Sequence, residues 1–189
     1  IGQRDCTDVL MQGLEKLEYR GYDSAGIAVF EKTGIKTVKT KGKLADMRHK
    51  LDIEGSPVGH CGIGHTRWAT HGEPSDINSH PHTNGRVTIV HNGIIENYIE
   101  LKEFLTEKGY TFTSQTDTEV VACLLDYYYS ERNPLRAITE TLKELKGSYA
   151  LGIIFRDFPD RVYATRKESP LIVGIGENEY LSLIHISEP

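Results

Sequence analysis

The sequence predicts an α+β fold in which amphipathic helices cover antiparallel sheets. Residues 7–19 carry Leu10, Leu14 and Leu17 at the spacing that places them on one face of a helix. Residues 149–155 form a short apolar run of the kind found in buried strands. Helices and strand pairs come in groups along the chain and do not alternate strictly, which favours helices layered on antiparallel sheets over a doubly wound parallel sheet.

The first third of the chain predicts two helices separated by a β-hairpin. The helix at 7–19 has acidic residues early and Lys16 and Arg20 late, which suits the helix macrodipole, and Gly21 is suited to end it. The elements expected next are a strand at 24–30, a turn at 32–34, a strand at 35–40, a short helix at 43–51 and a loop at 54–57.

The middle of the chain predicts strands separated by loops. Strands are expected at 58–66 and 86–91, and loops at 73–76 and 80–85. The residues from Ile94 onward look helical and unlike a returning strand. The chain is therefore expected to pass from strand to helix directly after the second of these strands.

The remainder of the chain predicts three helices followed by strands. The first helix ends at Gly109, and the second begins with a capping box of Thr116 and Glu119. The third has Pro134 at its first helical position and is stopped by Gly147. The strands expected after it lie at 149–155, 161–165 and 171–175.

The composition is typical of a soluble globular domain. The 189 residues are 38% hydrophobic and 26% charged, which suits one domain. A formal net charge of −5 and a pI near 5.9 argue against nucleic acid or an anionic membrane as the main partner. No apolar run approaches the ~20 residues that cross a bilayer. Because the sequence does not open on a cationic and then apolar stretch, no secretory signal is expected. With only three widely spaced cysteines, we expect a cytoplasmic protein.

The residues with the clearest chemical use gather between positions 64 and 97. This stretch holds arginine, tryptophan, histidine, asparagine and glycine between two apolar runs. A solvated surface loop has no need of such a density of these residues. We therefore expect a small-molecule site built on two strand ends, with the rest of the chain as its scaffold.

Arg67 directly follows an apolar strand and is the strongest single indication of a carboxylate ligand. A guanidinium matches a carboxylate bidentately, and a strand end holds its side chain rigidly. A structural salt bridge explains this residue equally well. Asp117 is suited either to bind a ligand ammonium or to stabilise the N-terminus of its helix. Together, Arg67 and Asp117 would suit an α-amino acid.

A second indication of a functional site is the run His91-Asn92-Gly93. The amide of an asparagine and an adjacent backbone N–H can point two donors at a developing oxyanion. The alternative is a type I′ turn, for which Asn-Gly is a strong signal. Because the following residues look helical, a functional strand-to-helix junction is favoured over a turn.

The histidines raise the possibility of a metal site. None of them has a recognisable ligand spacing such as HExxH, so the sequence predicts no metal. The residues considered for it are His60, Cys61, His65, His71, His80, His82 and His91.

Five motifs together resemble a known family. They are LEYRGYDSAG (17–26), HTRWATHGEPS (65–75), HPH (80–82), HNGIIEN (91–97) and TDTE (116–119). In this order, over residues 1–180, they are similar to the glutaminase domain of the glutamine–fructose-6-phosphate aminotransferases, also called glucosamine-6-phosphate synthases. RWATHG and the Asn-Gly pair alone would also suit other class II glutamine amidotransferases.

The resemblance implies a four-layer αββα sandwich of the N-terminal nucleophile hydrolase type. In that family the cysteine of a CGIVG-type N-terminus attacks the glutamine amide, and its own α-amine serves as the base. The ammonia passes to a sugar-phosphate isomerase domain of the same homo-oligomeric parent, which makes glucosamine 6-phosphate for amino sugar biosynthesis. The resemblance implies no cofactor.

Matching motif positions imply a role for each site residue. Arg67 binds the α-carboxylate of L-glutamine, and Asp117 binds its α-amine. Asn92 and Gly93 form the oxyanion hole, and Gly93 also contacts the substrate. The other implied site residues are Trp68 on a loop that closes over glutamine and gates ammonia, Thr70 and His71 in the pocket wall, and Arg20 with Gly21 beside the nucleophile.

The chain departs from the family pattern at both ends. Ile1-Gly2 matches the tail of the family's first strand, so we expect the 189 residues to lack the nucleophile and to be inactive by themselves. Cys61 opens a CGIG run that mimics the family start, but it is internal and is interpreted as a buried packing residue. Residues 181–189 depart from the family and are expected to be non-native.

Two other functions stay open beside this enzyme fragment. A non-catalytic glutamine-sensing module would also combine an intact pocket with no nucleophile. A metal hydrolase built on the histidines is the third hypothesis.

Overall fold

The computed structural model describes residues 1–20, 23–68 and 72–184. Its helices are α1 (Cys6–Leu17), α2 (Leu44–Glu54), α3 (Tyr98–Glu107), α4 (Asp117–Tyr128) and α5 (Pro134–Glu144), with 3-10 turns at Glu18–Arg20 and Ser130–Arg132. Its strands are β1 (Ser24–Glu31), β2 (Gly34–Lys41), β3 (Gly62–Arg67), β4 (His82–Asn84), β5 (Val87–Ile95), β6 (Gly147–Phe155), β7 (Tyr163–Lys167), β8 (Ile172–Gly176) and β9 (Glu179–Leu183). Among these residues no helix is long and apolar enough to cross a membrane.

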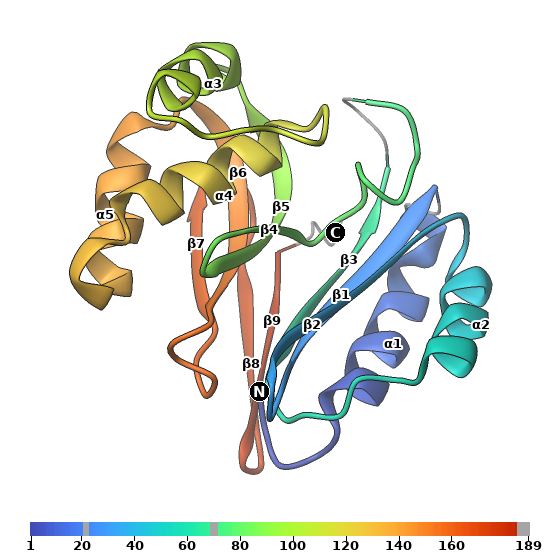
Figure 1. The fold of residues 1–189 in the computed structure, drawn as a ribbon. Helices are drawn as coiled ribbons and strands as arrows, with labels where there is room; N and C mark the ends of the chain where they lie inside the picture. The colour runs from blue at the N-terminus through green and yellow to red at the C-terminus, as the bar shows by residue number, and fades with distance from the viewer. Residues whose placement is uncertain (21–22, 69–71, 185–189) are drawn as a thin grey trace.

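Of the three antiparallel sheets in the described residues, the two larger ones stack face to face, and helices cover the outer face of each (Figure 1). The first sheet has the order β2-β1-β3 and packs against α1 and α2. The second has the order β4-β5-β6-β7 and packs against α3, α4 and α5. This arrangement confirms the predicted α+β class and its four αββα layers.

The period-two alternation of β1 builds two layers of core at once. Ile27 and Val29 point toward α1 and α2, and both are fully buried. Ala28 and Phe30 point the other way, into the space between the sheets, where they meet Ile154 of β6. A strand that is apolar on both faces belongs in the middle of a layered fold, so the continuous apolar run of β1 is explained.

The predicted helix starts are correct in two cases. Asn133 caps α5 by accepting from the backbone N–H of Arg136, with Pro134 at the first helical position. Thr116 caps α4 by accepting from the backbone N–H of Glu119 at 3.3 Å. The reciprocal half of the predicted capping box does not form, because the Glu119 carboxylate accepts instead from the backbone N–H of Ser114 at 2.7 Å.

The predicted strand-to-helix junction at His91–Gly93 is wrong. The segment lies inside β5, which continues to Ile95 and pairs with β6 along its whole length. Gly93 has a φ of 130°, and a Cβ there would lie 2.2 Å from the carbonyl oxygen of Ser148. Glycine is therefore required for a close approach of two strands, and the Asn-Gly pair forms neither a turn nor a helix start.

Other boundaries also differ from the predictions. The segment predicted as a loop at 80–85 contains β4, which is a short edge strand paired with β5. The strand predicted at 58–66 begins only at Gly62. No strand was predicted at β9, which pairs with β8. The domain boundary expected after residue 180 falls within β9 and stays a prediction.

Candidate active site

A cavity of about 450 Å³ lies between the two sheets and brings the predicted site residues together. It runs along β3 and reaches the end of β5 and the start of α4. Its lining includes Arg67, Trp68, Asn92, Gly93 and Asp117, which are far apart in sequence. The topology therefore collects around one cavity five of the residues that the motifs singled out.

Arg67 is the last residue of β3 and is only 4% exposed. Its Nη2 donates to the carbonyl oxygen of Gly72 at 3.2 Å. Burial lowers the pKa of Arg67, and the carboxylates of Asp23 and Asp117 act in the opposite direction. A guanidinium held this way presents a positive charge in the cavity wall, where a carboxylate would find little competing water.

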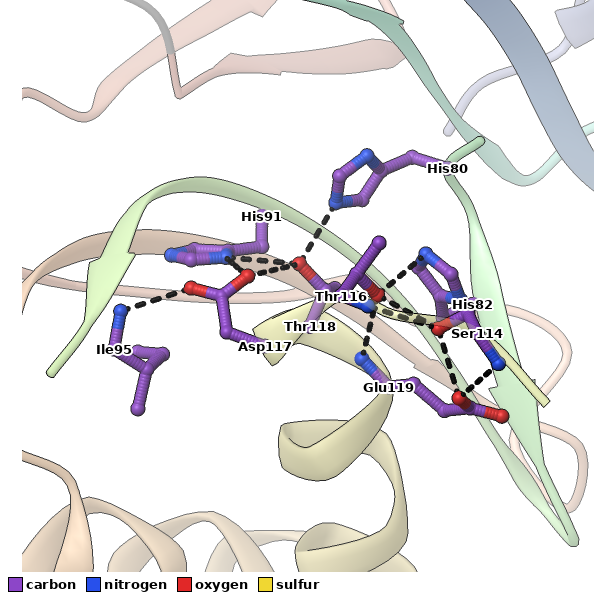
Figure 2. Close-up of polar contacts among 9 residues, drawn as sticks. All are labelled: His80, His82, His91, Ile95, Ser114, Thr116, Asp117, Thr118 and Glu119. Atoms are coloured by element: carbon purple, nitrogen blue, oxygen red, sulfur yellow. Dashed lines mark hydrogen bonds and ion pairs between the residues drawn. The ribbon is translucent and has the colours of Figure 1, made fainter. Parts of the chain in front are cut away.

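Asp117 is the first residue of α4 and is 6% exposed. Its Oδ2 accepts from the backbone N–H of Ile95 at 2.9 Å, which joins the helix to the end of β5 (Figure 2). Its Oδ1 accepts from the hydroxyl of Thr118 at 3.4 Å and lies 3.8 Å from Nδ1 of His91. Hydrogen bonds to both oxygens thus fix the orientation of the carboxylate, and each oxygen can still accept a further hydrogen bond from a ligand.

Asn92 and Gly93 lie near the end of β5, where they pair with Ala150 and Tyr149 of β6. Asn92 is partly buried, and its Nδ2 donates to the carbonyl oxygen of Ile184 at 3.0 Å. The amide therefore points toward a residue of the cavity wall, and its N–H group can donate to a carbonyl oxygen. An amide donor beside a glycine N–H is an arrangement that can stabilise an oxyanion.

The remaining predicted site residues are only partly covered by the structure. Trp68 follows β3 and is 63% exposed. The side chain of Arg20, together with Gly21, Thr70 and His71, lies outside the described residues. Their predicted roles stay predictions.

A buried polar network under the site was missed from the sequence (Figure 2). Thr118 of α4 contacts Nε2 of His80 at 2.9 Å and Nδ1 of His91 at 3.0 Å. A second branch runs from His82 to Thr116, whose hydroxyl lies 3.1 Å from the His82 Nε2. Two threonines at the start of α4, before its apolar run, are the signal in the sequence, because a helix end needs only one of them as its cap.

The histidines considered as metal ligands have other partners or lie apart. His80, His82 and His91 are bonded to threonine hydroxyls in this network, and His60 bonds to the carbonyl oxygen of Arg4. Within the described ranges, no three His, Cys, Asp or Glu side chains are grouped so that they could hold a metal ion.

All three cysteines are buried thiols. Burial raises the pKa of Cys6 and of Cys61 to about 11, and that of Cys123 to about 12. A thiol needs its thiolate form to act as a nucleophile, and these stay protonated at neutral pH. The interpretation of Cys61 as a buried packing residue is confirmed by its place in the core between the sheets.

Acid is expected to destabilise this fold through its neutral histidines. Burial lowers the pKa of His80 and His91, and it lowers that of His82 to about 3. An unfolded histidine titrates near pH ~6.5, so below that pH the unfolded chain binds more protons than the folded one. The stabilisation is complete above pH ~6.5 and is lost as the pH falls. Between pH ~6.5 and its folded pKa of about 3, His82 removes about 1.4 kcal/mol per pH unit.

Urea midpoints at pH 7.5 and 5.5 check this expectation. The midpoint should fall at the lower pH, and it should fall less in the variant His82→Gln. The exposed His49 offers a matched control, because His49→Gln should keep the pH dependence of the unchanged chain. Equal midpoints at the two pH values would contradict the expectation.

A buried guanidinium and a buried carboxylate, those of Arg67 and Asp117, thus line one cavity with Asn92 and Gly93. A comparison with known protein families gives a match to the glutamine amidotransferase domain over residues 65–181. The chain therefore belongs to the glutamine amidotransferase family.

Its curated relatives carry a more particular name. The chain is 57% identical over 182 residues to a glutamine–fructose-6-phosphate aminotransferase (isomerizing) of Clostridium tetani, and 58% identical over 182 residues to that of Clostridium perfringens. Each match covers 95% of this chain and 30% of the relative. The chain thus spans about a third of the length of these enzymes and is similar to a domain of each.

Solved structures agree on the fold. The glutamine phosphoribosylpyrophosphate amidotransferase of B. subtilis superposes with a TM-score of 0.83 at 25% identity, over 96% of this chain and 40% of that one. A second structure, described as the allosteric regulatory enzyme of purine biosynthesis, gives a TM-score of 0.81 at 27% identity, over 93% of this chain and 38% of that one. The predicted N-terminal nucleophile hydrolase type of sandwich is confirmed.

Proposed function

We propose that this chain is the glutaminase domain of a glutamine–fructose-6-phosphate aminotransferase, which binds L-glutamine and supplies its amide nitrogen as ammonia. One observation carries the proposal: a buried guanidinium and a buried carboxylate, Arg67 and Asp117, line the same cavity as Asn92 and Gly93. The names of relatives that match 95% of the chain support the same activity.

In this proposal each charged group of the substrate meets a side chain of opposite charge. Arg67 binds the α-carboxylate of glutamine bidentately, and Asp117 accepts from its α-ammonium. Asn92 and Gly93 donate to the amide oxygen as it becomes an oxyanion. Trp68, Thr70 and His71 complete the pocket, and Arg20 lies beside the attacking group.

The contacts of the N-terminal residues support a position for the nucleophile in this proposal. Gly2 donates its N–H to the carbonyl oxygen of His60, just before β3, and Ile1 exchanges hydrogen bonds with Tyr180 in β9. β3 is an edge strand among the described strands, and the cavity lies between it and β9. A segment joined to the N-terminus of Ile1 would therefore extend into this cavity, antiparallel to both strands.

The length of that segment can be estimated from β3. The strand has six residues and ends at Arg67, so an extended segment of about six residues at ~3.3 Å each would reach Arg67. A cysteine at its start would then face the cavity beside the substrate groups. This is the position that the CGIVG-type start of the family would supply.

The proposed chemistry follows from that position. The thiol transfers its proton to the cysteine's own α-amine, and the sulfur attacks the glutamine amide carbon. The amine passes the proton to the leaving nitrogen, which departs as ammonia and leaves a thioester. Water then hydrolyses the thioester to glutamate and restores the thiol.

The remaining parts of the proposal concern the parent protein. Ammonia would pass to its sugar-phosphate isomerase domain, which uses it to make glucosamine 6-phosphate. We place the parent in the cytoplasm as a homo-oligomer.

A glutamine-sensing module is the second candidate, and the three buried, protonated thiols favour it for the 189 residues alone. Sensor and enzyme both require binding, so calorimetric titration with L-glutamine tests what they share. Saturable binding is expected. D-glutamine should bind at least ~10-fold more weakly, because an enantiomer whose α-groups meet both charges would direct its side-chain amide away from Asn92 and Gly93. Absence of binding by the folded chain would refute both candidates.

A further inference from the structure

A single hydroxyl joins three ionisable side chains beneath the candidate site. The Oγ1 of Thr118 lies 2.9 Å from Nε2 of His80, 3.0 Å from Nδ1 of His91 and 3.4 Å from Oδ1 of Asp117. These groups come from the loop before β4, from β5 and from α4, so the hydroxyl links three separate segments (Figure 2). Thr118 itself is 1% exposed, which leaves no room for solvent to substitute.

Hydrogen-bond capacity leaves one arrangement that satisfies all three contacts. A threonine hydroxyl has one proton to donate and two lone pairs to accept with. The ionised carboxylate of Asp117 can only accept, so the hydroxyl proton points to it. Both lone pairs then accept N–H groups, one from His80 and one from His91.

The two rings are thereby fixed in opposite tautomers. His80 carries its proton on Nε2 and His91 carries its proton on Nδ1. The nitrogens left over, Nδ1 of His80 and Nε2 of His91, are buried and have no hydrogen-bond partner among the described residues. Both rings lie in surroundings that favour the neutral form, because burial lowers their pKa. Burying the unpaired lone pair of a neutral ring costs less free energy in such surroundings than burying an unpaired N–H of a charged ring.

We propose that Thr118 is a positioning residue that fixes His91 as the Nδ1–H tautomer and His80 as the Nε2–H tautomer, and that orients the Asp117 carboxylate toward the ligand ammonium. The role of Asp117 toward a ligand ammonium rests on the proposed function, whereas the assignment of the two tautomers does not. Thr118 touches no ligand itself. It acts through Asp117, whose Oδ1 it holds while the backbone of Ile95 holds Oδ2.

The tautomers can be read directly from the 189-residue chain. Two-bond correlations between ring protons and ring ¹⁵N nuclei at pH 7 distinguish Nδ1–H from Nε2–H, with signals assigned through His80→Gln and His91→Gln. The expected result is the pair of opposite tautomers stated above. His91 in the Nε2–H form, or as an imidazolium, would overturn the proposal.

Thr118→Val keeps the side-chain shape and removes the hydroxyl. The expected result is loss of the fixed tautomers and a Kd for L-glutamine raised ~10-fold, as for the loss of a hydrogen bond to a charged group. Thr118→Ser restores the hydroxyl and should return both properties. An unchanged Kd and unchanged tautomers in Thr118→Val would overturn the proposal.

Thr141 supplies a matched control, because it is fully buried in α5 and its hydroxyl has no partner among the described residues. Thr141→Val should change neither tautomers nor Kd, and an equal rise of Kd in this variant would overturn the assignment to Thr118. If Thr118→Val fails to fold, the tautomers of the unchanged chain and of Thr118→Ser decide the matter. If the unchanged chain binds no glutamine, the proposed function fails while the tautomer measurement still decides for or against Thr118.

Discussion

Joining a CGIVG segment and one further residue to Ile1 is expected to turn the 189-residue chain into a glutaminase. β3 lies at the edge of its sheet among the described strands, and the segment would enter the cavity between β3 and β9, where its cysteine would reach Arg67. A positioned nucleophile with its own base is a large contribution to catalysis, so ammonia release should rise by ~10⁴-fold or more over the unextended chain. A coupled assay of ammonia or glutamate measures it.

Two variants of the extended chain show which sulfur acts. Replacing the new first cysteine with serine should return the rate to that of the unextended chain. Cys61→Ser should leave the rate unchanged, because that thiol is buried between the sheets and stays protonated. A rate that depends on Cys61, or a folded extended chain that is inactive, would contradict this account.

Arg67→Met is expected to weaken binding of L-glutamine by about 100-fold or more. The substitution removes the buried guanidinium that faces the ligand carboxylate, and truncating one partner of a buried charge pair costs about 2–5 kcal/mol. Arg67→Lys keeps the charge and loses the bidentate geometry, so its affinity for L-glutamine should lie between those of the unchanged chain and of Arg67→Met. Calorimetric titration of each variant with L-glutamine measures the effect.

The chain offers a matched control for this arginine. Arg86 donates a hydrogen bond to Asp126 and lies over the ring of Tyr129. None of these three residues lines the cavity. Arg86→Met should therefore leave glutamine affinity unchanged. Binding by Arg67→Met within threefold of the unchanged chain would show that the ligand carboxylate lies elsewhere.

Much of the fold follows from local signals in the sequence. The apolar spacing of α1 and the Asn133-Pro134 start of α5 report directly on helices, because caps and amphipathic faces are local. The grouping of helices and strands gave the α+β class. The four layers were expected only through the resemblance, since stacking order depends on contacts between distant segments.

The errors occur where distant segments override a local signal. Asn92-Gly93 resembles a turn or a junction, yet it lies inside β5 because the strand β6, more than fifty residues later, pairs across it. The network of Thr118 with His80 and His91 has the same origin. It exists only because α4 packs across β4 and β5, and no spacing within the chain could indicate it.

Four of the predicted site residues lie together in the structure, and their roles stay predictions. Arg67, Asn92, Gly93 and Asp117 were selected for their chemistry, and all four line one cavity. Which groups hold them in place could not be predicted, because their partners are backbone atoms such as the N–H of Ile95 and buried hydroxyls such as that of Thr118.

The most direct test of the central claim is to map the L-glutamine site by NMR on the ¹⁵N-labelled 189-residue chain. We predict that saturable shifts cluster at the end of β3, at Asn92 to Ile95 of β5 and at the start of α4, and that Asp117→Asn removes them. Shifts confined to other surfaces, or none in a folded chain at saturating L-glutamine, would contradict the claim that this cavity is a glutamine site.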